Sequence, residues 1–110
     1  SGYAAGERLA ADPEVTAVFC ANDEVAIGLI RAMHEHGRRV PQDVSVVGFD
    51  GLSLGEYSFP PLTTVRQDFR RAGSEMVGLV LEQVDSGVGG GARQILIPTE
   101  LVVRGSTASA

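Results

Sequence analysis

The stretch VFCANDEVAIGLI, residues 18–30, decides the fold. Its first half belongs to a β-branched and aromatic run, residues 15–21, which is typical of a short buried strand. Its second half begins a segment that predicts a helix over residues 23–36, and Asn22 and Asp23 join the two directly. A buried strand that runs straight into a helix indicates an α/β fold.

The same alternation continues along the chain. Four further elements are predicted. An Ala-rich segment favours a helix at residues 3–11, helical spacing of apolar residues predicts another at 69–86, capped by Asp68, and buried strands are expected at residues 44–49 and 62–66. Continuous apolar strands that alternate with helices predict an α/β fold with a parallel sheet flanked by helices.

The C-terminal part of the sequence is less regular. Residues 85–92, DSGVGGGA, are expected to form a flexible connection. RQILIP and TELVVR predict two strands or one bent strand over residues 93–104, because Pro98 between them cannot donate a backbone hydrogen bond. The small and polar tail, residues 105–110, is expected to be frayed.

Composition restricts the classes of function. The chain has 110 residues, enough for one small domain, and a formal net charge of −5 without any cluster of Lys and Arg, so we expect no nucleic-acid surface here. The single cysteine, Cys20, excludes an internal disulfide. No apolar run reaches the ~18 residues that a membrane span needs, and no signal peptide is recognisable. A start without Met suggests a fragment or a processed piece.

Polar side chains follow the first two strands at the point where each strand ends. Asn22 follows the first strand and Asp50 the second, and α/β folds bind ligands at the carboxyl ends of parallel strands. An amide that donates and accepts, together with a carboxylate that accepts, suits the hydroxyl groups of a sugar or a ribose. Structural interpretations stay open: Asp23 is a good helix cap, and Asp50 before Gly51 is typical of a turn. Asn22 itself is open equally to a ligand role and to a structural one.

The helix that follows this joint is unusually apolar. In VAIGLIRAM, residues 25–33, only Arg31 is charged, and the apolar side chains point in several directions instead of forming one stripe. Either the helix is central within its own fold or a second subunit covers it, and the short chain favours the subunit. His34 and His36 lie on different sides of the helix, so no metal site is expected. No group of residues indicates catalysis or a cofactor.

Three motifs carry a resemblance to a known family. FCANDEVAIGLIRAMHEHGRRVPQDVSVVGFD, FPPLTTVRQD and IPTELVVRGST, in this order and spacing, closely resemble the C-terminal part of bacterial transcriptional regulators of the lactose/galactose repressor (LacI/GalR) family. The resemblance implies a partial two-lobed, periplasmic-binding-protein-like type I fold. Residues 1–66 are then mostly C-terminal lobe, residues 67–104 cross into the N-terminal lobe, and the DNA-binding helix-turn-helix is absent from the chain.

The resemblance also implies roles for individual residues. It places Asn22, Asp50, Gln67 and Phe69 at positions that contact the ligand, and Ile27, Ile30, His34 and Ser58 on a dimer surface. The sequence departs from the family at Gly51, where repressors commonly carry Asp or Asn. Glycine at that position is also frequent in secreted sugar-binding relatives.

Two functions follow from these observations. The first is the ligand-sensing and dimerisation part of a cytoplasmic transcriptional regulator. Its effector is a sugar or a nucleoside, and its protein partner is a second copy of itself. It contacts DNA only through the helix-turn-helix that is absent from this chain, and no contact with a membrane is expected. The alternative is a periplasmic sugar-binding protein of an ABC-type transporter, which acts as a monomer. Enzymatic activity is not expected.

Overall fold

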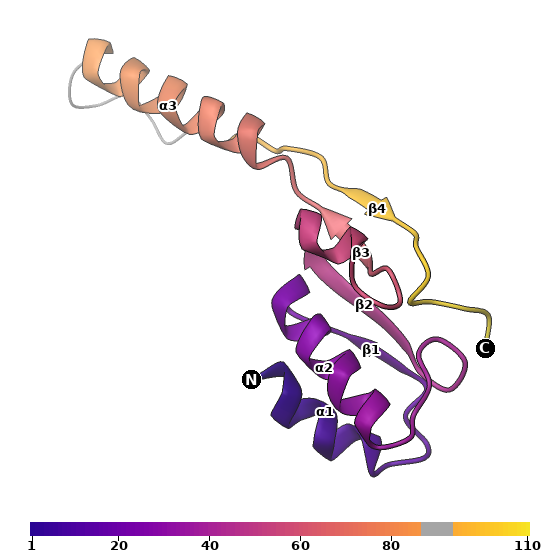
Figure 1. Cartoon of the computed structure of the whole chain (residues 1–110). Helices are drawn as coiled ribbons and strands as arrows, with labels where there is room; N and C mark the ends of the chain where they lie inside the picture. Colours follow the sequence, from indigo (N-terminus) through magenta and orange to yellow (C-terminus); the bar gives the residue numbers. More distant parts are fainter. Residues whose placement is uncertain (87–93) are drawn as a thin grey trace. The chain divides into compact units, whose positions relative to one another are not determined.

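A four-stranded sheet organises most of the chain (Figure 1). The computed structural model describes residues 1–86 and 94–110. Their elements are, in order, α1 (Gly2–Ala10), β1 (Ala17–Phe19), α2 (Asp23–Glu35), β2 (Ser45–Asp50), the short 3-10 helix η1 (Ser53–Glu56), β3 (Thr63–Arg66), α3 (Phe69–Ser86) and β4 (Glu100–Val102). By their packing these residues divide into two compact units, residues 1–66 with 100–110, and residues 67–99.

The sheet has the strand order β1-β2-β3-β4. The first three strands are parallel, and β4 pairs antiparallel with β3 at the edge. In this register Val18 lies beside Val46, and Gly48 lies beside Thr64. The predicted α/β fold with a parallel sheet and flanking helices is therefore confirmed, with one antiparallel edge strand in addition.

The core lies between the sheet and α2. Its buried apolar side chains come from both elements and from the segments that join them: Cys20, Ala26, Leu29, Ile30, Met33, Val44, Val46 and Leu62. α1 runs beside α2 (Figure 1), and Gly6 permits the close approach, because a Cβ there would lie 2.7 Å from the Cβ of Ala32. The sheet and α1 together thus cover much of α2, so part of its apolar character is explained within the chain itself.

The opposite face of the sheet carries exposed apolar side chains. Successive residues of a strand point to opposite faces, so Phe19 lies on the other face of the sheet from its neighbour Val18 and from the buried Val46 that Val18 pairs with. The rings of Phe19 and Phe49 lie 6.5 Å apart, and Phe19 is 66% exposed. Leu101 of β4 is 62% exposed.

The C-terminal tail differs from the sequence-based prediction. Residues 105–110 are predicted to be frayed, but Ser106 is fully buried. Its hydroxyl donates to the carbonyl of Val46 at 2.6 Å and accepts from the N–H of Thr63 at 2.8 Å. The N–H of Val46 donates to the carbonyl of Ser106 at 2.9 Å. The prediction is wrong for this part of the tail, because its small polar residue satisfies buried backbone groups of β2 and β3.

The predicted C-terminal strands are also shorter in the structure. β4 covers three residues, and residues 94–99 are irregular, with Pro98 unable to donate to a sheet. The prediction of two strands or one bent strand over residues 93–104 is therefore wrong for residues 94–99. The predicted flexible connection, residues 85–92, lies outside the described residues except for the last two residues of α3.

The division of the chain differs from the expected one at its C-terminal end. Residues 100–104 are expected to follow residues 67–99 into the other lobe. In the structure they pair with β3 and belong to the same unit as residues 1–66. The antiparallel pairing of β4 is the physical reason, because its backbone hydrogen bonds are made with β3.

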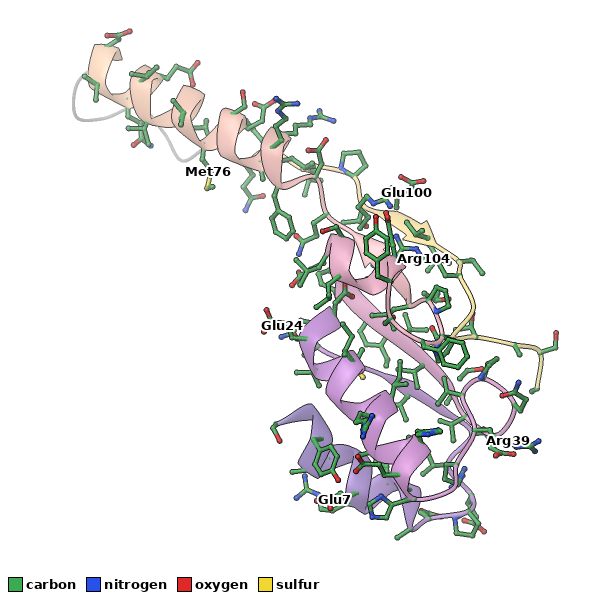
Figure 2. The ribbon with its side chains drawn as sticks, viewed as in Figure 1. Glu7, Glu24, Arg39, Met76, Glu100 and Arg104 are labelled. Carbon is green, nitrogen blue, oxygen red and sulfur yellow. The ribbon has the colours of Figure 1, made fainter. Side chains whose placement is uncertain are left out.

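α3 makes up most of the second unit. The N–H of Arg71 donates to Asp68 Oδ1 at 2.9 Å, as expected for a helix cap. Apolar side chains recur at helical spacing and are exposed within this unit, among them Met76 (Figure 2), which is 62% exposed. Among the residues that the structure describes, no helix is both long and apolar enough to span a membrane.

Candidate functional site

Asn22 caps α2 at the edge of the sheet. It directly precedes the first helical residue and has extended backbone angles, φ −158° and ψ 171°. Its Oδ1 accepts from the N–H of Val25 at 2.9 Å. The expectation that Asp23 caps this helix is therefore wrong, because the helix already begins at Asp23 and the cap is one residue earlier. An Asn side chain that accepts through Oδ1 still carries two N–H donors on Nδ2.

Asp23 instead points into the protein. Its side chain is completely buried, and its Oδ2 accepts from the N–H groups of Gly51 at 3.0 Å and Leu52 at 2.7 Å. Its Oδ1 accepts from the hydroxyl of Thr64 at 2.6 Å. A buried carboxylate is tolerated only when hydrogen bonds replace its water, and these three donors do so.

The sequence contained a signal for this role of Asp23. Gly48 interrupts the otherwise continuous apolar run of β2, and glycine inside a strand indicates that another group approaches closely. A Cβ on Gly48 would lie 2.3 Å from Asp23 Oδ1. The glycine therefore makes room for the carboxylate.

Asp50 ends β2 in an unusual backbone conformation. Its φ is +115°, a region that residues other than glycine rarely adopt, and the following Gly51 has φ +80°. A Cβ on Gly51 would lie 2.8 Å from the Cα of Arg66, the residue opposite Asp50 on β3. Glycine at position 51 is thus required by the turn and by its neighbour, which gives a local reason for the departure from the family pattern.

The structure brings two of the four predicted ligand residues to one edge. Asn22 follows β1 and Asp50 ends β2, and these strands are parallel neighbours. Both residues are partly exposed. Gln67 and Phe69 belong to the second unit, where Phe69 is the first residue of α3 and is 55% exposed.

A groove of about 580 Å³ lies elsewhere on the first unit. All four residues predicted for the dimer surface line it: Ile27, Ile30, His34 and Ser58. The other lining residues come from the end of α2, the turn before β2 and the loop before β3: Arg31, Arg38, Arg39, Val40, Pro41, Gln42, Phe59 and Pro60. Ile30 also belongs to the core and is only 6% exposed, whereas Phe59 is 95% exposed.

The arginines of this groove are engaged by other groups. Arg31 donates to Glu35 at 2.6 Å, and Arg38 donates to the backbone carbonyls of Asp12 and Val15 at 2.7 and 2.5 Å. Arg39 (Figure 2) forms an ion pair with Asp43 at 3.0 Å. The side-chain hydrogen bond from Arg39 lowers the pKa of Asp43 to about 2. Carboxylates thus balance the charges of Arg31 and Arg39, Arg38 is held by neutral carbonyls, and the remaining lining of the groove is mostly apolar.

Two other features carry no site. Cys20 is buried in the core, and its burial raises the pKa of the thiol. A raised pKa keeps a thiol protonated and unreactive. Within residues 1–86 and 94–110, no three His, Cys, Asp or Glu side chains gather closely enough to hold a metal ion.

Comparisons with known proteins add a family context. Residues 1–107 match the family model described as a periplasmic binding protein-like domain. The HTH-type transcriptional repressor PurR of Haemophilus influenzae is 40% identical over 112 aligned positions, which cover 98% of this chain and 33% of the relative. The HTH-type transcriptional regulator MalR of Streptomyces coelicolor is 47% identical over 97 residues, which cover 88% of this chain and 28% of that relative. The chain thus spans at most about a third of the length of these relatives.

Solved structures are similar over nearly the whole chain. A Lac repressor dimer bound to operator and the anti-inducer ONPF matches with a TM-score of 0.86 and 37% identity, over 98% of this chain and 37% of that one. The complex of the transcriptional regulator CelR with cellobiose matches with a TM-score of 0.88 and 38% identity, over 96% of this chain and 32% of that one. A LacI family regulator from Enterococcus faecalis with bound ribose matches with a TM-score of 0.88 and 37% identity, over 97% of this chain and 39% of that one.

Proposed function

The chain belongs to the family of periplasmic-binding-protein-like domains, and from this premise we propose that it is the ligand-sensing and dimerisation part of a bacterial transcriptional regulator of the LacI/GalR type. Its relatives among transcriptional regulators and its structural neighbours support this function. The observation that carries the proposal is the pair of Asn22 and Asp50, an amide and a carboxylate at one edge of two parallel strands.

The ligand is a small molecule rich in hydroxyl groups, either a sugar or a nucleoside. The Nδ2 of Asn22 donates to a hydroxyl oxygen, and the carboxylate of Asp50 accepts from hydroxyl groups. Gln67 supplies a second amide, and the exposed ring of Phe69 offers an apolar surface to the ligand. Ribose and cellobiose, held by two structural neighbours, are ligands of this chemical class.

The two units correspond to parts of two lobes. The larger unit, residues 1–66 with 100–110, belongs to the C-terminal lobe. The smaller unit, residues 67–99, belongs to the N-terminal lobe. A ligand that binds one arrangement of the lobes more tightly shifts the population toward it by its differential affinity. The regulator acts in the cytoplasm and contacts DNA through a helix-turn-helix outside this chain. The chain itself neither catalyses a reaction nor holds a cofactor.

A second copy of the protein docks on the groove beside α2. Phe59 is almost fully exposed there, and Ile27, Val40 and Pro41 add apolar surface. Burial of such surface contributes about 25 cal/mol per Å². Glu35 and Asp43 balance the charges of Arg31 and Arg39, which reduces the repulsion between two identical surfaces.

The alternative is a periplasmic sugar-binding protein of an ABC-type transporter. Gly51 favours it, since secreted sugar-binding relatives often carry glycine at that position. The turn geometry weakens this observation, because φ +80° and the nearby Arg66 backbone require glycine whatever the compartment. The regulator therefore remains the better supported function.

The full-length protein separates the two functions. For the regulator we expect a dimer in sedimentation velocity, a rise in melting temperature with at least one member of a panel of ribose, cellobiose, lactose and adenosine, and a sugar-dependent mobility shift of DNA from upstream of its own gene. A monomer that binds a sugar but no DNA would overturn the regulator in favour of the transporter.

A further inference from the structure

We propose that Asp23 is a positioning residue for ligand binding, whose buried carboxylate holds the turn after β2 so that Asp50 faces the ligand. The inference rests on the proposed ligand role of Asp50. Asp23 itself touches no ligand, since its side chain is completely buried. It acts through the backbone of the two residues that follow Asp50.

Three elements meet at the Asp23 carboxylate. α2 begins beside the carboxyl end of β2 (Figure 1), and Asp23 in its first turn receives the N–H groups of Gly51 and Leu52 on Oδ2, at 3.0 and 2.7 Å. On Oδ1 it receives the hydroxyl of Thr64 from β3 at 2.6 Å. One side chain therefore ties the start of α2 to the turn after β2 and to the neighbouring strand.

The turn needs such a restraint. Asp50 has φ +115°, which residues other than glycine populate rarely, and the next residue, Gly51, has φ +80°, which glycine adopts readily. The N–H groups of Gly51 and Leu52, the two residues after Asp50, both donate to the Asp23 carboxylate, and hydrogen bonds to a carboxylate are stronger than those to a neutral acceptor. The carboxylate thus selects the backbone conformation that fixes the direction of the Asp50 side chain.

A purely structural role for Asp23 explains less. The helix cap is already supplied by Asn22, and an apolar residue of similar size would leave the N–H groups of Gly51 and Leu52 without this acceptor. β2 also carries a glycine where a Cβ would lie 2.3 Å from the carboxylate, so Gly48 accommodates Asp23 at this point. Asp23 directly follows Asn22, and it bonds the residue directly after Asp50, so it links the two proposed ligand groups.

A double-mutant cycle on the full-length protein tests the proposal. The probe is whichever of ribose, cellobiose, lactose and adenosine binds most tightly in calorimetry. We expect Asp23→Ala to weaken binding about tenfold or more, and Asp23→Ala with Asp50→Ala to weaken it no further than Asp50→Ala alone. Fold losses that multiply in the double variant would mean that Asp23 does not act through Asp50, and the proposal would be wrong.

Thr64→Val is the matched control. It removes the bond to Oδ1 of the same carboxylate and leaves both amide bonds on Oδ2, so it should lower the melting temperature but change the dissociation constant less than about threefold. An equal loss of affinity in Thr64→Val would show general destabilisation and overturn the positioning role. If Asp23→Ala does not fold, Asp23→Asn replaces it. Its Oδ1 can accept both amides while Nδ2 donates to Thr64, so near-normal binding is expected, and a loss as large as that of Asp50→Ala contradicts the proposal.

Amide hydrogen exchange separates this proposal from the proposed function. In Asp23→Ala, the backbone amides of residues 49–54 should exchange faster than in the wild-type protein. In Asp23→Asn, they should exchange at the wild-type rate. An unchanged rate in Asp23→Ala overturns the positioning role regardless of any ligand. Normal binding by Asp50→Ala, or no binding of any probe by the wild-type protein, overturns the proposed ligand site instead, and the exchange result then decides on Asp23 alone.

Discussion

Asn22 combines a structural and a proposed binding role that one substitution can separate. Asp is as good a helix cap as Asn but lacks the two N–H donors. We expect Asn22→Asp to keep the melting temperature and to weaken ligand binding, whereas Asn22→Ala loses about 1 kcal/mol of stability in addition. Thermal unfolding and calorimetry on the full-length protein measure the two effects. Equal affinity of wild type and Asn22→Asp would exclude the amide from the ligand site.

Position 51 requires glycine because its φ is positive and because the backbone of Arg66 lies close to it. Gly37 has nearly the same φ, +76° against +80°, but a Cβ there would meet nothing within 4 Å. Gly37→Ala should therefore cost only the backbone strain, about 1 kcal/mol, and Gly51→Ala should cost about 1 to 3 kcal/mol more because its Cβ would lie 2.8 Å from the Cα of Arg66. Chemical denaturation of both variants checks this, and equal losses would contradict the steric account.

The residue scale is also where sequence reasoning was least complete. Asn22 and Asp23 both satisfy the rules for a helix cap, and only the residue at which the helix begins decides between them. Ser106 bonds Val46 and Thr63, which lie 60 and 43 residues away in the sequence, so no local pattern could predict its burial. Gly48 in the middle of β2 indicated that another group approaches this strand closely. Only the packing of α2 against β2 identifies that group as the carboxylate of Asp23.

At the scale of elements, local sequence patterns predicted the helices and parallel strands well. α1, α2, α3, β2 and β3 lie within a few residues of their predicted bounds, because each pattern depends on neighbours along the chain. β4 was predicted too long, since its extent is set by pairing with β3 and not by its apolar residues. The apolar character of α2 was assigned mainly to a partner, while α1 and the sheet supply much of its cover.

The turn between α2 and β2 carries a pH-dependent ion pair. Arg39 lowers the pKa of Asp43 from 3.8 to about 2, chiefly through a side-chain hydrogen bond. Because the folded pKa lies below the unfolded one, the ion pair stabilises the fold above about pH 4, and this contribution is lost as the pH falls toward 2. NMR titration should give Asp43 a pKa near 2 that rises toward 3.8 in Arg39→Gln. A normal pKa in the wild-type protein would contradict the pairing.

The groove beside α2 makes a direct prediction about self-association. Ile27→Glu places a charge on the apolar lining, and burial of an unpaired carboxylate in a dimer is strongly unfavourable. We expect the full-length variant to dissociate at concentrations where the wild type is dimeric, as measured by sedimentation velocity. Ala11→Glu adds the same charge at an exposed position outside the groove and should leave the dimer intact. A dimeric Ile27→Glu protein would exclude the groove as the interface.

At the scale of the whole molecule, the chain represents a minor part of its relatives, between 28% and 33% of the two regulators described above. The sheet leaves Phe19 and Leu101 exposed on one face, and α3 leaves Met76 exposed, so each unit retains apolar surface beyond its own core. For the full-length protein we propose that a ligand acts through its differential affinity for the arrangements of the two lobes, and that this coupling carries the signal to the DNA-binding region.

The calorimetric titration of wild-type and Asp50→Asn full-length protein with the sugar and nucleoside panel tests the central claim most directly. Asp12→Asn is the control, because it changes a carboxylate in the same way between α1 and β1, away from the carboxyl ends of the strands. We predict that one member of the panel binds the wild type and Asp12→Asn equally, and Asp50→Asn at least about tenfold more weakly. Equal binding by all three proteins would contradict the account of this edge of the sheet as a ligand site.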